Sequence, residues 1–567
     1  MNWKVFPKIE IEKKELYNLH PVALEILFRR GIKTQKEIES FLHPDYENDL
    51  SDPSAFSGME KAIERIGLAR EKKEKVLIFG DYDADGITAS LVLKQVLSWM
   101  GIEAQSYIPN KELEGYGINM AAVEKFSKEG IDLIITVDCG ITSIAEVERI
   151  KQLGTDIVIT DHHFVPKKIP LADAVINPKL KDNSCDCGDL AGVGVAFKLA
   201  QALCGKFLPG KEDQLKWLLD LVAIGTVADC VSLVGENRTL VKYGLVVLSK
   251  TRRVGILELF KVGRIQIDED NFPDTQKISF QIAPRINAAG RMDHAKIAFD
   301  LLLENDPVRA REMALEVEAH NQNRQKITKQ VVDEAMAEAE EKFKNKKIIF
   351  SRSEHFPVGI VGLAAGRVAN KYNRPVGIFR KEKDVSTGSF RSIPLVDIIE
   401  VIGECGEFLE KFGGHSQAAG VTVKNENFDK FCAKMDQVIE KKLEGVDISP
   451  EIKIDAELSA EDIGFKLSDE IRRMEPFGQG NPEPVFAIRN MIVQDLKWVG
   501  NGEKHLKLFL RPDDDSPRIF EAIGFSVPEK FREIKTGDKV DIAFNLEQDQ
   551  WNGSKKLQLK IVDLKVL

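Results

Sequence analysis

The chain has 567 residues, 43% of them hydrophobic and 30% charged, a composition typical of a globular protein with about three to five domains. Its net charge of −10 excludes a uniformly basic nucleic-acid-binding protein, so any polyanion must meet a local basic groove or bound cations. The seven cysteines are odd in number and scattered, which argues against a disulfide framework and predicts reduced thiols in the cytoplasm. No stretch approaches the ~20 apolar residues of a membrane-spanning helix, and residues 1–15 lack the apolar core of a signal peptide.

The predicted elements change character along the chain. Residues 1–55 are expected to form a helical, peripheral segment. Residues 56–308 alternate short apolar strands with helices, which predicts a doubly wound parallel sheet. Residues 309–345 read as one long helix, either a connector between lobes or a surface helix of the same lobe. Residues 346–448 repeat the α/β pattern on a smaller scale, and residues 449–567 alternate at period two, as strands of a β-barrel do.

Three predicted strands stop directly at acidic residues or histidines. Their positions are 76–80, followed by Asp81, Asp83 and Asp85; 133–137, followed by Asp138; and 157–160, followed by Asp161, His162 and His163. In an open parallel sheet the ligand site lies just beyond the carboxyl ends of the strands. Carboxylates gathered at one edge repel one another unless a cation lies among them, so the pattern predicts a metal centre.

Residues 81–86 (DYDADG) allow two other interpretations. The pattern also opens an EF-hand calcium loop, but that loop requires Glu at its twelfth position, where this chain has Val92. The segment also follows a strand rather than a helix, which disfavours calcium. A plain acidic turn remains the alternative for this segment taken alone, because Asp and Gly are common turn residues.

A pair of divalent ions about 3.5–4 Å apart would explain the cluster, and such pairs usually hydrolyse phosphate esters. A ligand set of oxygens with one imidazole suits Mn²⁺ or Mg²⁺ better than Zn²⁺. Asp229, which follows an apolar helical run, is a further candidate ligand. His162 and His163 cannot point the same way in extended backbone, so one is expected to bind metal and the other to reach elsewhere, for instance to a phosphate.

These motifs carry a family resemblance. DYDADG at 81–86, VDCG at 137–140 and Asp161-His162-His163 resemble the DHH phosphoesterase superfamily and, within it, the RecJ family of single-strand-specific 5′→3′ DNA exonucleases. Further matching segments, in family order, lie at 108–111, 115–117, 192–198, 224–229, 284–291 and 413–415. The resemblance covers residues 50 to 560. It implies a multidomain α/β fold: a parallel-sheet DHH domain, a long connecting helix, a smaller α/β DHH-associated domain and a C-terminal OB-fold barrel.

The resemblance also implies roles for the residues of the centre. Asp83 and Asp138 would hold one metal ion, and Asp85, Asp138, His162 and Asp229 would hold the other. Asp81 belongs to the same motif and is counted with the metal residues. His163 would contact the scissile phosphate, and Asp161 would orient a histidine from behind.

Further residues would bind the substrate. Arg285 or Arg291 would meet the nucleic-acid backbone, and Arg291 is counted with the catalytic residues. Ser389, Arg391 and His415 would face the site from the second lobe. Lys111 stands where many relatives carry Arg, which keeps the charge but loses the bidentate fork. With Ser389 and Arg391 it would form a 5′-phosphate pocket, and Tyr116 would either stack on a base or be an ordinary turn tyrosine.

The implied function is an exonuclease of DNA repair and recombination that releases 5′-mononucleotides from single-stranded DNA. A single-strand-binding protein and a helicase would be its partners, and a monomer is the family default. Trp498 and Trp551 with nearby lysines would serve a strand-binding groove, although core packing is favoured for Trp498. One alternative is a DHH phosphoesterase for short oligonucleotides, cyclic dinucleotides or adenosine bisphosphate. A second, a non-catalytic replication scaffold, is disfavoured because no ligand is missing.

Overall fold

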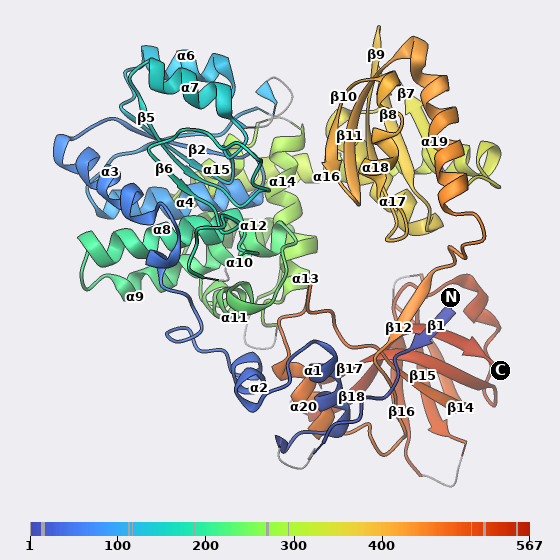
Figure 1. Ribbon diagram of the computed structural model, residues 1–567. Helices are drawn as coiled ribbons and strands as arrows, with labels where there is room; N and C mark the ends of the chain where they lie inside the picture. The colour runs from blue at the N-terminus through green and yellow to red at the C-terminus, as the bar shows by residue number, and fades with distance from the viewer. Residues whose placement is uncertain are drawn as a thin grey trace.

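The computed structural model of the protein comprises three lobes (Figure 1). It describes residues 2–567 apart from 13–16, 111–113, 116, 186–187, 268–270, 293, 501, 514–516 and 552–553. Lys111 and Tyr116 therefore lie outside the described residues. Among the described residues, no helix is both long and apolar enough to cross a membrane.

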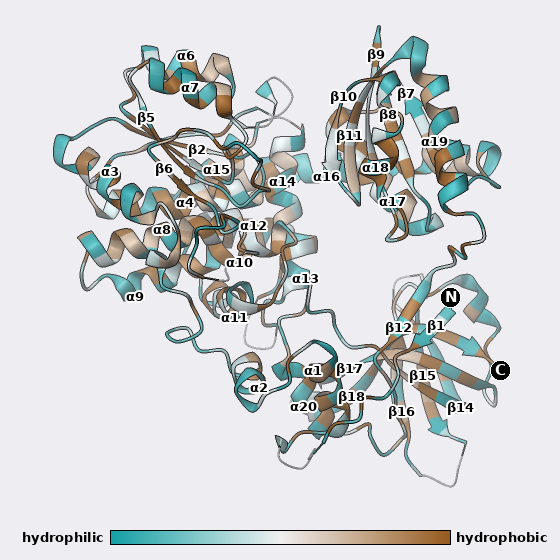
Figure 2. Cartoon of the chain, viewed as in Figure 1, coloured by the Kyte–Doolittle hydropathy of each residue, from teal (hydrophilic) through white to brown (hydrophobic). Residues whose placement is uncertain are grey.

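The first lobe is built on a five-stranded sheet, all of whose strands run parallel in the order β3-β2-β4-β5-β6. The strands are β2 (Val76–Gly80), β3 (Gln105–Tyr107), β4 (Leu133–Val137), β5 (Asp156–Thr160) and β6 (Ala174–Ile176). Every residue of β2 and β4 is buried, because helices cover both faces of the sheet. Figure 2 shows the central strands as a hydrophobic layer inside this lobe. The predicted doubly wound sheet is confirmed.

Helices pack on both faces of that sheet and form two separate cores. One face carries α6 (Met120–Lys128) and α7 (Ile144–Gln152). The core on the other side is formed by a larger set: α3 (Met59–Lys72), α4 (Ala84–Trp99), α8 (Gly192–Phe207), α9 (Glu212–Leu215), α10 (Leu219–Ala228), α11 (Gly235–Ser249), α12 (Val254–Gly263), α14 (Ala283–Met292) and α15 (Lys296–Leu303). The short helix α13 (Thr275–Lys277) precedes α14.

Helix α16 (Pro307–Lys342) leaves the first lobe and enters the second. Its N-terminal half contributes Ala310, Ala314 and Val317 to the core of the first lobe. Its C-terminal half contributes Val331 and Ala335 to a core of the second lobe. The helix is therefore a connector between lobes, and the surface-helix alternative is wrong.

The second lobe contains a mixed five-stranded sheet in the order β10-β11-β9-β8-β7. Its elements are β7 (Ile349–Ser353), α17 (Val358–Tyr372), β8 (Val376–Lys381), β9 (Val385–Arg391), α18 (Ile398–Gly403), β10 (Leu409–His415), β11 (Ala418–Lys424) and α19 (Phe428–Lys442). Only β7 and β8 pair in parallel, and the remaining pairs are antiparallel. The smaller α/β domain is thus confirmed.

The third lobe is a six-stranded sheet whose additional β14–β17 pairing closes a ring of strands. It comprises β13 (Ala456–Glu457), α20 (Phe465–Arg473), β14 (Phe486–Val499), β15 (His505–Pro512), β16 (Phe520–Gly524), β17 (Lys539–Trp551) and β18 (Ser554–Val566). The burial of β15 alternates strictly, with Leu506, Leu508 and Leu510 inside, as the period-two pattern predicts. The predicted barrel is confirmed.

The N-terminal segment differs from its prediction as a helical, peripheral piece. It opens with a strand, β1 (Asn2–Val5), which pairs in parallel with β12 (Glu451–Ile454), more than 400 residues away in sequence. Helices α1 (Pro21–Arg29) and α2 (Gln35–Leu42) follow, and their buried residues belong to the core of the third lobe. A four-residue strand whose only partner is so distant has no local signal.

The cysteines agree only partly with the expectation of reduced thiols. Cys139, Cys204, Cys230, Cys405 and Cys432 are free. Cys185 is disulfide-bonded, so the expectation is wrong at that residue.

Candidate metal centre

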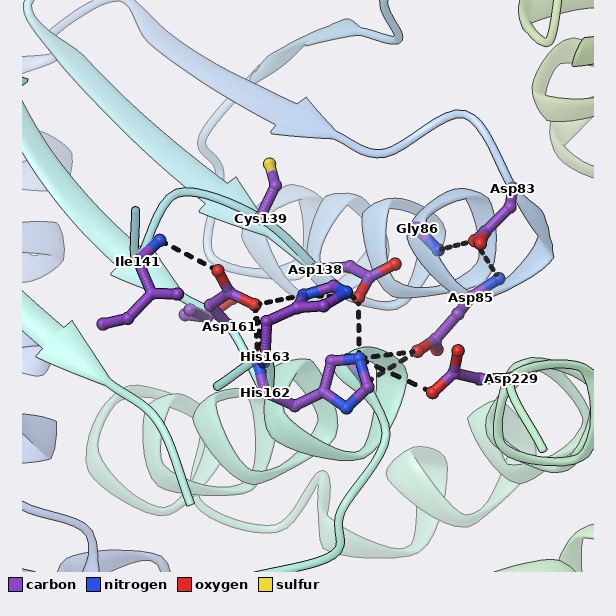
Figure 3. Close-up of polar contacts among 12 residues, drawn as sticks. Asp83, Asp85, Gly86, Asp138, Cys139, Ile141, Asp161, His162, His163 and Asp229 are labelled. Atoms are coloured by element: carbon purple, nitrogen blue, oxygen red, sulfur yellow. Dashed lines mark hydrogen bonds and ion pairs between the residues drawn. The ribbon is translucent and has the colours of Figure 1, made fainter. Parts of the chain in front are cut away.

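The centre lies where the carboxyl ends of β2, β4 and β5 meet α4, α8 and α10 (Figure 3). Strand β2 leads into Asp81 and Asp83, and α4 begins with Asp85 in its first turn. Strand β4 leads into Asp138, which adopts a left-handed backbone conformation at φ +61. Strand β5 leads into Asp161, His162 and His163. Asp229 is the residue that caps the carboxyl end of α10.

Three overlapping groups of side chains have ligand atoms within 4.8 Å of one another. They are Asp81, Asp83 and Asp138; Asp85, His162 and Asp229; and Asp138, His162 and His163. Asp138 belongs to two of the three, so it occupies the position from which one carboxylate can bridge two ions. The sequence-predicted metal residues are thus brought together, all six of them.

The imidazole of His162 faces the carboxylates through Nε2. This atom lies 3.1 Å from Asp138 Oδ1, 3.5 Å from Asp229 Oδ2 and 3.9 Å from Asp85 Oδ2. Burial lowers the pKa of His162 to about 3, with further contributions from His163 and Lys179. The ring is therefore neutral at physiological pH, which is the form that binds a metal ion.

The buried carboxylates experience the opposite shift. Burial first, and then the neighbouring acids, raise the pKa of Asp85 and of Asp138. Burial and Asp83 raise the pKa of Asp229 to about 7. Without a cation this cluster would have to take up protons, whereas a divalent cation would keep all three acids ionised.

The orphaned atoms of the centre fit a bound cation. Within the described part of the chain, the buried atoms Asp138 Oδ1 and His162 Nε2 lie 3.1 Å apart, but neither makes a well-oriented hydrogen bond. Buried polar atoms in folded proteins are rarely left this way. A set of carboxylate oxygens with one imidazole nitrogen suits Mn²⁺ or Mg²⁺.

Asp85 is oriented by the start of α8. Its two carboxylate oxygens accept hydrogen bonds from the backbone amides of Gly192 at 2.7 Å and Val193 at 2.8 Å. These are unsatisfied first-turn amides, and the positive end of the helix dipole favours the carboxylate. A Cβ at Gly192 would lie 2.6 Å from Asp138 Cβ, so this position requires glycine.

Asp161 orients the second histidine rather than joining a ligand group. Its Oδ1 accepts from His163 Nδ1 at 2.7 Å and from the amides of His162 and His163, and its Oδ2 accepts from the amide of Ile141 at 2.9 Å. Burial alone would lower the pKa of His163, but the hydrogen bond and charge of Asp161 outweigh it and raise that pKa. Because Nδ1 faces Asp161, Nε2 lies on the far side of the ring.

The two candidate arginines of α14 differ in their partners. The Arg285 guanidinium is engaged by Glu318 at 2.6 Å and by the carbonyls of Gln281 and Gly263. Arg291 donates to the carbonyl of Gly359 at 3.3 Å. Burial lowers the pKa of Arg291, and the charges of Tyr82 and Asp83 in the metal-site loop oppose that shift. The geometry therefore favours Arg291 over Arg285 as the arginine beside the centre.

The second lobe presents its three predicted residues on one face of its sheet. His415 is paired with Ala418, and Ala418 with Arg391, so these residues form one row across β10, β11 and β9. Ser389 lies in the next row of the same face and accepts from Arg391 Nη1 at 2.9 Å. Helix α17 packs on the same face, where a Cβ at Gly362 would lie 3.1 Å from both Arg391 Nη2 and Ser389 Oγ.

Sequence reasoning missed two residues that hold the centre in place. The side chain of Asn287 accepts from the amide of Ala84 at 2.7 Å and fixes the loop before α4. The Lys179 ammonium donates to the carbonyl of His162. Asn287 lies within the predicted 284–291 motif, so its motif was a usable signal, whereas Lys179 lies in no motif.

Models of three protein families match most of the chain. The profile of the DHH family N-terminal domain matches residues 75–226, the DHHA1 domain matches 324–441, and the RecJ OB domain matches 454–563. These segments correspond to the three lobes described above.

Individual relatives cover almost the whole chain. The single-stranded-DNA-specific exonuclease RecJ of Dickeya dadantii is 34% identical over 97% of this chain and 97% of its own length. That of Bacillus subtilis is 35% identical over 100% of this chain and 71% of its own length. The crystal structure of RecJ in complex with Mn²⁺ from Thermus thermophilus superposes with a TM-score of 0.82 and 26% identity, over 100% of this chain and 79% of that one. The chain therefore belongs to the RecJ family of DHH proteins.

Proposed function

We propose that this protein is a single-stranded-DNA-specific exonuclease that degrades its substrate 5′→3′ to 5′-mononucleotides in DNA repair and recombination. The observation that carries the proposal is the set of three overlapping ligand groups, which share Asp138 and His162, in a chain of the RecJ family. The relatives are named for action on single-stranded DNA, and their solved structures hold Mn²⁺ or Mg²⁺.

Two divalent ions are proposed for the centre, Mn²⁺ or Mg²⁺. Asp81, Asp83 and Asp138 would hold one ion, and Asp85, His162 and Asp229 would hold the other, with Asp138 between them. When bound, such a pair acts as a Lewis acid and lowers the pKa of water to near neutrality. The neutral His162 ring and the amide-fixed Asp85 support this assignment, since neither has to rearrange to bind.

The remaining residues of the site would stabilise charge on the substrate. Asp161 holds His163 by Nδ1 and favours its protonated form, so Nε2 can donate to a non-bridging phosphate oxygen. Arg291 would add a second positive charge at the same phosphate. No protein nucleophile is required, because hydrolysis uses water.

The end of the strand would be recognised by the second lobe. Ser389, Arg391 and His415 share one face of the sheet, and Arg391 has no carboxylate partner among the described residues. A guanidinium beside a hydroxyl suits a terminal phosphate. Lys111 and Tyr116 are proposed for the same pocket and for a stacked base.

The third lobe is proposed to hold the following part of the strand. Trp498 packs partly against the barrel core, with Arg532 over its ring at 4.6 Å, which supports a structural role for this residue. Lys497 and Lys504 lie on the same β14–β15 hairpin. We expect affinity for long strands to fall as salt rises.

We propose five domains or segments: an N-terminal segment at 1–55, the DHH catalytic domain at 56–308, the connecting helix at 309–345, the DHH-associated domain at 346–448 and the OB-fold at 449–567. Residues 1–55 would act with the barrel, because they pack against it. A cytoplasmic monomer that works with a helicase and a single-strand-binding protein is proposed from the family resemblance.

The test is a chelator-stripped protein to which Mn²⁺ or Mg²⁺ is restored, acting on a 3′-labelled single strand with and without a 5′-phosphate. The expected result is metal-dependent release of mononucleotides from the 5′ end, with faster turnover of a fifty-mer than of a dinucleotide. Equal rates on blunt duplex and single strands would contradict strand selectivity. Faster turnover of the dinucleotide would favour a short-oligonucleotide phosphoesterase.

A further inference from the structure

The buried face of α16 changes character where the helix passes between the first and second lobes. Residues at spacings of three and four form this face, and the apolar members at each end belong to the two cores. In chain order the buried residues are Ala310, Ala314, Val317, Asn321, Thr328, Val331, Val332, Ala335 and Ala339, and the half-buried Arg324 lies on the same face. We call Asn321, Arg324 and Thr328 the polar window. The apolar stripe is thus interrupted by polar residues at the point where the helix leaves one core and has not yet entered the other.

Arg324 is incompletely satisfied inside the window. Its Nη2 donates to Asn321 Oδ1 at 2.8 Å, and its backbone carbonyl accepts from Thr328 Oγ1 at 2.7 Å. Asn321 and Thr328 are almost fully buried, at 1% and 2% exposed. Arg324 Nε is buried as well, and it has no hydrogen-bond partner within the described part of the chain. A guanidinium edge withdrawn from water without an acceptor is costly unless a ligand completes it.

Other arginines surround the window. Helix α16 packs against both α14, which carries Arg291, and α17, which carries Arg367. Burial first, and then the charges of Arg291, Arg367 and Arg285, lower the pKa of Arg324 to about 10. Arg391 of β9 lies on the other side of α17, where a Cβ at Gly362 would lie 3.1 Å from its Nη2.

These arginines lack the acids that neutralise arginines elsewhere in the molecule. Arg285 pairs with Glu318 at 2.6 Å, and Arg65 pairs with Asp156 at 2.6 Å. By contrast, no ion pair joins Arg291, Arg324, Arg367 or Arg391 to a carboxylate in the residues that the structure describes. Gathered positive charges of this kind favour binding of a polyanion.

We propose that Arg324 binds a backbone phosphate of the single strand, so that the polar window of the connecting helix forms part of the substrate path. The proposal rests on the proposed function, and it adds a residue that the DHH and RecJ motifs do not contain. A guanidinium offers two parallel donors to a phosphate, and no acceptor in the described part of the chain satisfies Arg324 Nε. The phosphate would lie beside the one assigned to Arg291.

The experiment measures binding of a 5′-phosphorylated single strand in chelator, so that no cleavage occurs, for wild type and Arg324→Gln. Lys326→Gln is the matched control, because Lys326 is exposed on the same helix and makes none of these contacts. We expect Arg324→Gln to weaken binding about tenfold or more and to reduce the salt slope by about 0.7, the value for one phosphate of single-stranded DNA. Lys326→Gln is expected to match wild type in both.

A second measurement replaces the phosphates one at a time with neutral methylphosphonates. In wild type, a methylphosphonate at one position should weaken binding. The same replacement should not weaken binding to Arg324→Gln, because the substitution has already removed that phosphate contact. If Arg324→Gln does not fold, Arg324→Lys serves in its place, with an expected smaller loss at that position. Identical scans for wild type and variant, or an unchanged salt slope, would overturn the proposal. A wild type that neither binds nor degrades single strands would instead overturn the proposed function.

Discussion

At the scale of single residues, two adjacent histidines are given opposite properties by their surroundings. Burial keeps His162 neutral, with its pKa lowered to about 3, whereas Asp161 raises the pKa of His163. One residue is thus prepared to bind a cation and its neighbour to donate to an anion. The two imidazoles nevertheless lie close together, with ring centroids 4.6 Å apart, and both belong to a ligand group with Asp138, so the expectation that they point in different directions is wrong.

Replacing Asp161 with Asn tests the role of this carboxylate. The variant keeps the shape but removes the charge that raises the pKa of His163, so His163 should lose its proton at lower pH. We expect kcat on a single strand to fall about 10–100-fold at pH 8 and less at pH 6.5, while Mn²⁺ affinity changes little. Rate–pH profiles and calorimetric Mn²⁺ titration check this.

Asp182→Asn is the control for that variant, because Asp182 is exposed and belongs to no ligand group. An equal loss of kcat at both pH values in Asp161→Asn would argue against an effect through His163. A large loss of Mn²⁺ affinity would instead make Asp161 part of the ligand shell.

At the scale of elements, the ends of helices position the residues of the metal centre as much as the ends of strands do. The first turn of α8 binds Asp85 through two amides, and α10 ends at Asp229. Close approach makes glycine necessary, because a Cβ at Gly225 of α10 would lie 2.3 Å from Thr88 Oγ1 and 2.9 Å from Asp85 Oδ1. The glycine-containing motifs are therefore packing requirements of the metal site.

Gly192→Ala tests this requirement. The added methyl would meet Asp138 Cβ at 2.6 Å and displace the carboxylate shared by two ligand groups. We expect Mn²⁺ affinity to fall at least about tenfold and kcat to fall with it. The control is Gly205→Ala in the same helix, where nothing lies within 4 Å of the new Cβ. It should leave Mn²⁺ affinity unchanged and raise stability by about 0.5–1 kcal/mol.

Much of the first lobe could be predicted from the sequence, because fully buried parallel strands are continuous apolar runs and each ends at a recognisable acid. The barrel could also be predicted, because every second residue at the start of β15 is a buried leucine. Strand β1 could not be predicted, because its partner strand β12 lies far away in the sequence. Nor could Lys179 or the lack of acids around Arg324, since both depend on which side chains packing brings together.

At the scale of the whole molecule, one buried side chain fastens the third lobe to the first. Arg238 of α11 donates to the carbonyls of Phe41, Arg473, Met474 and Glu475, and its guanidinium lies 4.0 Å from the centroid of the Phe41 ring. Burial lowers its pKa to about 9, so it remains charged at neutral pH. Four carbonyls would lose their donor together if this arginine were removed.

Arg238→Ala is therefore expected to loosen the contact between these lobes without damaging the metal centre. The free energy of unfolding should fall by about 3 kcal/mol or more, because four carbonyls would lose their hydrogen-bond donor. Hydrogen exchange should rise in residues 470–481, and the affinity for long strands should fall more than the turnover of a dinucleotide. Lys250→Ala, at the exposed end of the same helix, should change neither quantity.

The same junction carries an acid that makes stability depend on pH. Burial raises the pKa of Glu483 from 4.5 to about 7, with Glu547 and Glu475 adding to the rise and Lys560 opposing it. Because the pKa of Glu483 is higher in the folded state than in the unfolded state, ionising this acid destabilises the fold. This destabilisation is absent below pH 4.5 and grows as the pH rises towards 7. Glu483→Gln should therefore stabilise the protein at pH 8, by at most about 3 kcal/mol, and not at pH 4. Denaturant unfolding at both pH values checks this, with exposed Glu461→Gln as the control.

The most direct test of the account is anomalous diffraction from a crystal of this protein soaked in Mn²⁺. We predict two peaks about 3.5–4 Å apart, one bounded by Asp81, Asp83 and Asp138 and the other by Asp85, His162 and Asp229, with Asp138 touching both. A single peak away from Asp138, or carboxylates that remain dispersed around no peak, would contradict it.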